Sequence, residues 1–295
     1  MRLFQVREGG GAARLGILRD GRALVLESAH DGVATTLDLF EACEERGLVA
    51  SQWAAAAEQA GHFTALPWDD LAAHRADPRL TVPVSPPEVW GAGVTYRRSA
   101  DFREEGTGIY DRVYSAERPE LFFKATAWRC VAHGEAIGRR RDSSFTAAEP
   151  EIAIVVGRSG AILGFTLAND VSAWDIERDN PLYLPQSKVY TACFAFGPAI
   201  VTPDEIADPY AIALHCRVLR AGREVFAGEA TTGQLKRRFE ELVGWLARSN
   251  EVRTGTVLST GTGIIQPLGS GLEEGDVVVL SSPELGELRN PVALV

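Results

Sequence analysis

Short apolar segments, separated by glycine and turn residues, make up most of the pattern from about residue 89 to the C-terminus. Segments of this kind predict strands, because strands in globular proteins are short and are joined by turns. We therefore expect an α+β fold that is rich in β structure, in which a rolled, mixed or antiparallel β-sheet carries few helices.

The period changes to that of a helix between Thr232 and Ser249. Five apolar side chains there fall at i, i+4, i+7, i+8 and i+11, which places them on one helical face: Leu235, Phe239, Leu242, Val243 and Leu246. Thr232 is a suitable N-cap for this segment. The pattern predicts a helix that packs on the sheet.

The beginning of the chain has a pattern of its own. Three strands are predicted, over Arg2–Val6, Ala13–Leu18 and Arg22–Leu26. Asp20-Gly21 between the second and the third is a strong hairpin signal, because both residues tolerate the positive φ that a tight turn needs.

Two helices are expected after these strands. The first ends at Gly47 and has Thr36 or Asp38 as its candidate N-cap, and the second runs from Ser51 to Gly61. No group of catalytic residue types gathers in this part of the chain.

A proline-rich connector over residues 81–87 predicts a domain boundary. The chain has 295 residues, a length that suits one large domain or two unequal ones. We therefore expect a small N-terminal α/β domain over residues 1–84 and a catalytic domain over residues 85–295.

The net charge of −10 argues against a nucleic-acid partner or an anionic membrane surface, because no broad basic surface is available. No apolar run approaches the roughly 20 residues of a membrane-spanning helix. The N-terminal residues lack the apolar core of a signal peptide, and the four cysteines have no metal-binding spacing. A cytoplasmic enzyme is the expectation.

Three carboxylates mark the candidate site. Glu149 and Glu151 lead into the apolar run Ile152–Val156, and Asp170 ends the next predicted strand after a turn at Gly157–Gly160. Residues two apart on a strand point to the same face, so both glutamates aim at one place. Buried carboxylates that converge need a positive partner, and Mg²⁺ or Mn²⁺ prefers such oxygen ligands. Lys188 follows after a proline-rich loop.

The motifs in this part of the chain resemble the fumarylacetoacetate hydrolase family. They are, in chain order, Gly93-Val94-Thr95-Tyr96, Pro119 to Lys124, Glu149-Pro150-Glu151 with Asp170, and the Gly275-Asp276 turn. Thr95 stands where the family has asparagine. The resemblance implies that Glu149, Glu151 and Asp170 are the metal ligands, that Lys188 reaches the substrate, and that the protein is a homodimer.

The string from Glu177 to Lys188 resembles the sugar-acid dehydratase branch of that family. Hydrolytic members carry a His-Glu dyad just after the tyrosine of the first motif, and here that stretch, Arg97 to Phe102, contains no histidine. Glu177 also replaces a glutamine that is usual in hydrolytic members. The resemblance therefore implies the dehydration of a 2-keto-3-deoxy sugar acid of pentonate type.

Dehydration needs an acid and a base beside the metal. Lys188 is the candidate at the C2/C3 end of the substrate, and Glu117 or Glu177 is the candidate for the other proton transfer; the sequence does not choose between the two. The candidates for holding the hydroxyl and carboxylate groups of the substrate are Arg97, Ser99 and Thr262.

Two alternatives stay open at this point. One is an acylpyruvate or β-diketone hydrolase that activates water without the histidine dyad. The other is a non-catalytic protein that binds a keto acid in the acidic pocket. An intact set of three acids together with a lysine favours catalysis over binding alone.

Overall fold

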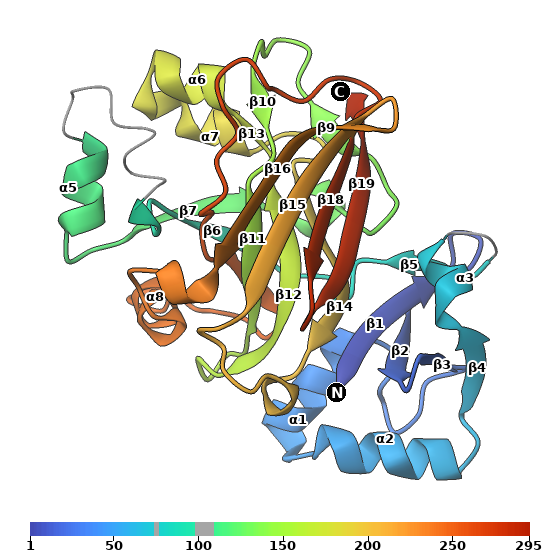
Figure 1. Ribbon diagram of the computed structural model, residues 1–295. Coiled ribbons are helices and arrows are strands. Elements are labelled where there is room, and N and C mark those ends of the chain that lie inside the picture. Colours follow the sequence, from blue (N-terminus) through green and yellow to red (C-terminus); the bar gives the residue numbers. More distant parts are fainter. Residues whose placement is uncertain (74–76, 98–108) are drawn as a thin grey trace.

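A large sheet forms the body of the protein, which the computed structural model describes over residues 1–73, 77–97 and 109–295 (Figure 1). Its strands are β1 (Arg2–Arg7), β2 (Arg14–Arg19), β3 (Arg22–Leu26), β4 (Phe63–Pro67), β5 (Arg79–Thr81), β6 (Val89–Gly93), β7 (Glu120–Ala125), β8 (Cys130–Val131), β11 (Pro150–Val156), β12 (Ile162–Asp170), β14 (Phe194–Val201) and β17 (Thr256–Ser259). The main order is β4-β3-β2-β1-β14-β12-β11-β17-β6-β7, and β5 and β8 pair with β1 and β14.

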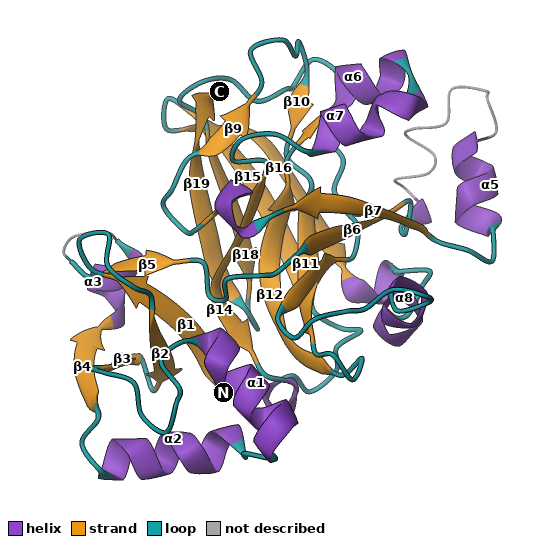
Figure 2. Ribbon diagram, turned by 180° about the vertical axis from the view of Figure 1, so that it is seen from behind, coloured by secondary structure: helices purple, strands orange, loops and turns teal. Residues whose placement is uncertain are grey.

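A second sheet lies across the middle of the large one (Figures 1 and 2). It contains β9 (Ile137–Arg139), β15 (Ala213–Arg220), β16 (Arg223–Thr231), β18 (Val277–Ser282) and β19 (Gly286–Leu294), in the order β16-β15-β18-β19-β9. Two short strands, β10 (Thr146–Ala147) and β13 (Ser172–Ala173), pair with each other. Parallel pairing occurs between β8 and β14, β6 and β17, and β9 and β19, and the other described pairs are antiparallel.

Helices are short and lie around the sheets. They are α1 (Thr36–Arg46), α2 (Ala50–Gln59), α3 (Trp68–Ala72), α5 (Ile109–Ser115), α6 (Trp174–Asp179), α7 (Leu184–Lys188) and α8 (Phe239–Leu246), with single 3₁₀ turns η1 (Ala127–Arg129), η2 (Pro181–Tyr183), η3 (Pro203–Glu205) and η4 (Thr232–Gln234). No helix among the described residues is long and apolar enough to cross a bilayer. The expected β-rich fold with few helices is confirmed.

The central strand β11 is buried on both faces, which explains its unbroken apolar sequence. Ile152 and Ile154 belong to the core between the two sheets. Ala153 and Val155 point the other way, into a second core that includes side chains of α1 and α2. A strand of this kind has a fixed register, because a shift by one residue would exchange the two faces.

The N-terminal elements form where the sequence predicts them. Asp20 and Gly21 have φ angles of 51° and 73°, as the β2–β3 hairpin requires. Helix α1 is capped by Thr35, which exchanges hydrogen bonds with Asp38 in a capping box. The predicted N-cap, Thr36 or Asp38, is therefore wrong: Thr36 is the first helical residue and Asp38 is the third.

The N-terminal strands also continue the main sheet. β1 pairs with β14 through Arg2 with Val201 and Leu3 with Ile200. A continuous sheet therefore crosses the boundary that we place after residue 84, and the division into two domains stays a prediction.

The helix predicted from Thr232 to Ser249 is wrong at its N-terminal end. Thr232 lies in the 3₁₀ turn η4, and α8 begins only at Phe239. Leu235 between them is extended and forms a β-bridge with Tyr96. Its apolar side chain falls on the helical spacing, but a tertiary contact decides its conformation.

Glu44, near the end of α1, links the N-terminal elements to the β11–β12 turn through hydrogen bonds. Its carboxylate accepts hydrogen bonds from Ser159 Oγ at 2.9 Å, from the backbone N–H of Arg158 at 3.3 Å and from the hydroxyl of Thr254. Burial raises the pKa of Glu44, but these hydrogen bonds outweigh it, so the pKa lies below its ordinary value of 4.5.

We expect Glu44→Gln to lower the free energy of unfolding by about 1 kcal/mol at pH 7, a modest figure because the group is partly exposed. The contribution of a carboxylate with a lowered pKa is present above the unfolded-state value and is lost as the pH falls through the folded-state value. The difference between wild type and variant in urea unfolding should therefore shrink below about pH 4.5.

The matched control is Glu45→Gln. Glu45 is an exposed neighbour with one ion pair to Arg158 at 3.0 Å, and its loss should change stability little. Equal effects of the two variants, or a Glu44→Gln effect that does not change with pH, would contradict this account.

Candidate metal and catalytic site

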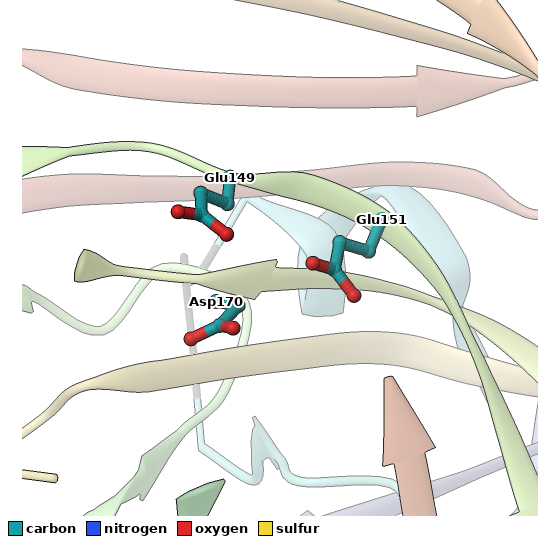
Figure 3. A group of neighbouring side chains, drawn as sticks. All are labelled: Glu149, Glu151 and Asp170. Carbon is teal, nitrogen blue, oxygen red and sulfur yellow. The ribbon is translucent and has the colours of Figure 1, made fainter. Parts of the chain in front are cut away.

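Three acidic side chains meet at the ends of β11 and β12 (Figure 3). The strands pair with Glu151 opposite Ala168 and Pro150 opposite Asn169, and the backbone N–H of Asp170 donates to Glu149 O at 3.0 Å. This register brings oxygen atoms of Glu149, Glu151 and Asp170 within 4.8 Å of one another. All three are almost completely buried.

Two buried lysines neutralise part of this negative charge. Lys188, the last residue of α7, places Nζ 2.9 Å from Glu149 Oε2, 3.0 Å from Asp170 Oδ2 and 2.7 Å from Ser172 Oγ. Lys124, near the end of β7, places Nζ 2.6 Å from Asp170 Oδ1. Asp170 therefore lies between two ammonium groups.

Glu151 is held by uncharged donors instead. Its Oε2 accepts hydrogen bonds from Ser259 Oγ at 2.5 Å and from the backbone N–H of Gly261 at 2.7 Å. Burial, followed by the charges of Asp170 and Glu149, raises the pKa of Glu151 to about 8. The metal-free site thus disfavours the simultaneous ionisation of all three carboxyl groups.

The donor set fits a hard divalent cation. Three carboxylates in one small buried space repel each other, and a divalent ion among them would remove that repulsion. Mg²⁺ takes carboxylate oxygens and keeps some positions for water or substrate. Glu149, Glu151 and Asp170 are the residues that would hold it.

A pocket opens onto these carboxylates. Its described lining residues are Ala92, Gly93, Val94, Glu120, Phe122, Glu149, Glu151, Asp170, Glu177, Leu184, Lys188, Gly261 and Thr262. The structure therefore brings together six of the residues named from the sequence: Glu149, Glu151, Asp170, Lys188, Glu177 and Thr262.

The segment before Lys188 is more regular than the expected proline-rich loop. Residues 174–188 form α6, the turn η2 and α7, which together close one side of the pocket. Glu177 on α6 is buried, and Lys188 lies one residue before the C-cap of α7. The prolines stand at the starts of η2 and α7, where a missing backbone N–H costs nothing.

Glu117 and Glu120 differ in position. Glu117 is exposed and is not among the described residues that line the pocket, whereas Glu120 lines it. The carboxylate of Glu120 lies over Gly93, where a Cβ atom would overlap it. Sequence reasoning missed Glu120, although a strand that begins there puts Glu120, Phe122 and Lys124 on one face.

Lys124 was the second omission. In the sequence Lys124 is only the last residue of the Pro119 to Lys124 motif, but the structure buries it completely beside Asp170. Alternation along β7 places Lys124 on the same face as Glu120 but does not show that this face points to the carboxylates.

Two predicted substrate-binding residues lie elsewhere or cannot be placed. Arg97 is exposed, pairs with Asp111 at 3.1 Å, and is not among the described lining residues. Ser99 lies outside the described residues.

Histidine is absent from the described lining of the pocket. His133, the histidine nearest to the site segments in the sequence, has a structural role: Nε2 lies 2.9 Å from Ala72 O, and Nδ1 accepts the backbone N–H of Arg289 at 3.2 Å. The described site therefore offers carboxylates and lysine for proton transfer.

Comparison with known proteins identifies the class of protein. The fumarylacetoacetate (FAA) hydrolase C-terminal family matches residues 88–293, so the chain belongs to this family.

Within the curated proteins, the chain is 48% identical over 223 residues to the 2-dehydro-3-deoxy-D-arabinonate dehydratase of Saccharolobus solfataricus, covering 73% of this chain and 75% of the relative. It is 43% identical over 222 residues to the probable 2-keto-3-deoxyxylonate dehydratase of Haloferax volcanii, covering 74% and 76%. A solved structure of 2-keto-3-deoxy-D-arabinonate dehydratase with magnesium and 2,5-dioxopentanoate superimposes with a TM-score of 0.86 at 38% identity, covering 100% of this chain and 99% of that one.

Glu151→Gln provides a test of the metal site that leaves both lysines paired. Glutamine can still accept the hydrogen bonds of Ser259 and Gly261, so the fold should persist. The loss of one charged ligand should weaken Mg²⁺ binding, measured by calorimetry, by at least about tenfold.

Asp170→Asn should weaken Mg²⁺ binding as well, but with a lower melting temperature, because it removes the charge between Lys124 and Lys188. Unchanged Mg²⁺ affinity in both folded variants would rule out this ligand set.

Proposed function

We propose that this protein is a Mg²⁺-dependent dehydratase of 2-keto-3-deoxy sugar acids of the pentonate type and forms a 2-keto acid that carries an aldehyde. The observation that carries the proposal is the buried carboxylate cluster with Lys188 at the floor of a pocket. The similarity to two sugar-acid dehydratases along most of the chain supports this substrate class.

Glu149, Glu151 and Asp170 hold the metal in this proposal. When bound, Mg²⁺ supplies positive charge that polarises the 2-keto group and favours loss of the proton at C3. The protein contributes a nearly dry surrounding, in which each charge acts more strongly than in water.

Lys188 handles the proton at the C2/C3 end. Its ammonium group lies among Glu149, Asp170 and Ser172 and also faces the Phe122 ring, 5.1 Å from the ring centre. Nearby positive charge from a metal would favour its neutral form, which can accept a proton.

A carboxylic acid assists departure of the C4 hydroxyl as water. Glu120 and Glu177 both line the pocket; Glu120 belongs to β7 and Glu177 to α6. Glu120 therefore joins Glu177 as a candidate, in place of Glu117. Loss of the C3 proton and of the C4 hydroxyl as water leaves a C3=C4 double bond. Loss of a proton from C5 and protonation at C3 give an enol at C5, and protonation of this enol at C4 gives the 2-keto acid with its aldehyde.

Thr262 is the proposed contact for a substrate hydroxyl or carboxylate. It is buried in the pocket lining, and its Oγ1 lies 3.1 Å from the backbone N–H of Ile264, which fixes its orientation. Contacts from Arg97 and Ser99 remain predictions.

We also propose that the enzyme is a cytoplasmic homodimer, as the family resemblance implies. Light scattering at micromolar concentration should give twice the chain mass of 31.9 kDa. A monomer would count against this part of the proposal.

The reaction is tested by incubating the pure protein and Mg²⁺ with 2-keto-3-deoxypentonates, 2-keto-3-deoxyhexonates, acylpyruvates and oxaloacetate. Loss of water from a pentonate should be the fastest reaction, and in D₂O the product should carry deuterium at C3. Faster cleavage of an acylpyruvate would favour a hydrolase, and binding without turnover would favour a keto-acid binding protein.

The proton-transfer roles are tested by substitution. Lys188→Ala should reduce kcat by at least about a hundredfold, the usual scale for such a group. Glu120→Gln and Glu177→Gln should each reduce kcat, and the larger loss identifies the acid. Glu117→Gln, an exposed carboxylate three residues before Glu120, is the matched control and should retain wild-type activity.

A further inference from the structure

Lys124 has three polar partners behind the site. Its side chain is 0% exposed, and Nζ lies 2.6 Å from Asp170 Oδ1, 2.9 Å from Val171 O and 2.6 Å from Lys188 O. Two of these contacts are hydrogen bonds to main-chain carbonyls, and the contact with Asp170 is a buried ion pair. Lys124 does not appear in the described lining of the pocket, whereas Lys188 does.

The three contacts join three elements of the site. Lys124 extends from β7, Asp170 and Val171 stand at the end of β12, and Lys188 ends α7. One oxygen of Asp170 contacts Lys124 and the other contacts Lys188, so the plane of the carboxylate is fixed from both sides. The contact with Lys188 O fixes the main chain from which the Lys188 side chain starts.

The chain's use of lysine supports a specific role. Of the 30 basic residues, three are lysines, at positions 124, 188 and 236, and two of these lie beside the carboxylates. A compact ammonium group directs its three hydrogens to partners in different directions around one atom, whereas the donors of a guanidinium lie in one plane. Elsewhere the chain meets its need for positive charge almost entirely with arginine.

We propose that Lys124 is a positioning residue that holds the Asp170 carboxylate and the Lys188 main chain in one arrangement. When a metal binds, the Lys188 ammonium group can then move away from the carboxylates while Asp170 keeps its position. The inference rests on the metal site and on the role of Lys188 given under the proposed function. Lys124 itself touches neither metal nor substrate.

Lysine labelled with ¹³C at Cε and ¹⁵N at Nζ provides a direct test, because the spectrum contains three side chains. Lys188→Met and Lys236→Met variants assign the signals. In the wild type without substrate, the two Cε protons of Lys124 should be inequivalent, since its ammonium group is fixed. On addition of Mg²⁺ the Lys188 signal should move, while the Lys124 signal should stay nearly in place.

A Lys124 signal that is averaged like that of exposed Lys236, or that moves as far as that of Lys188, would overturn the proposal. This measurement needs no Lys124 variant and no turnover. Absence of dehydratase activity in the wild type would instead overturn the proposed function and would leave this result unaffected.

Lys124→Met removes the ammonium group and keeps the length of the side chain. In the metal-free wild type the Cε protons of Lys188 should also be inequivalent, because its ammonium group has three fixed partners. In Lys124→Met we expect this inequivalence to disappear and kcat at saturating Mg²⁺ and substrate to fall by at least about tenfold, with little change in KM. A lysine that served only to balance charge would give the opposite result: tighter Mg²⁺ binding, unchanged Lys188 signals and unchanged kcat.

Lys236→Met is the control, because Lys236 is exposed and contacts the carbonyl of Tyr114 away from the carboxylates. It should leave the Lys188 signals and kcat at wild-type values. Should Lys124→Met fail to fold, the wild-type Mg²⁺ titration decides the question.

Discussion

The mutual repulsion of Glu149, Glu151 and Asp170 is the constraint on which the rest of the site depends. Three carboxylates with oxygens within 4.8 Å of each other, all buried, are unstable as three negative charges without compensation. The protein compensates in part, with Lys124 and Lys188 on two of them and neutral donors on the third. Burial, with a further contribution from the charges of Asp170 and Glu149, raises the pKa of Glu151 to about 8.

The fold makes this crowding possible because the acids stand at the ends of strands that are anchored by buried apolar residues. β11 is covered on both faces, so its register is determined along its whole length by Ile152, Ile154 and their neighbours. The energy that holds Glu149 and Glu151 in place comes from that burial. The carboxylates therefore need not attract one another to stay together.

The pattern of residues within short segments predicted those parts of the structure whose conformation depends on neighbouring residues in the sequence. The β2–β3 turn, the run from Ile152 to Val156 and the convergence of the three acids follow from turn residues and from a period of two. Leu235 was misassigned because its conformation depends on a bridge to Tyr96, which lies far away in the sequence. Spacing along a segment carries no information about such a contact.

The same limit applies to the site. Lys124 and Glu120 lie on β7, which enters the site from the far edge of the sheet beyond β17 and β6. β6 and β17 pair in parallel although they lie over 150 residues apart in the sequence. Neither segment alone predicts this pairing. Alternation along β7 would have placed Glu120, Phe122 and Lys124 on one face, but not the direction in which that face points.

The charges of the pocket also affect how the proposed metal and keto-acid substrate would bind. Five carboxyl groups line it, from Glu120, Glu149, Glu151, Asp170 and Glu177, and Lys188 is the one cation among the described lining residues. A keto acid is itself an anion, so the metal-free pocket repels it, and Lys188 is occupied by Glu149 and Asp170. A divalent cation would reduce the repulsion of the substrate, because its positive charge offsets the negative charge of the carboxylates. It would also free Lys188, because the carboxylates would then have the metal as a partner. Under the proposed function, close burial of the acids therefore favours metal binding before substrate binding.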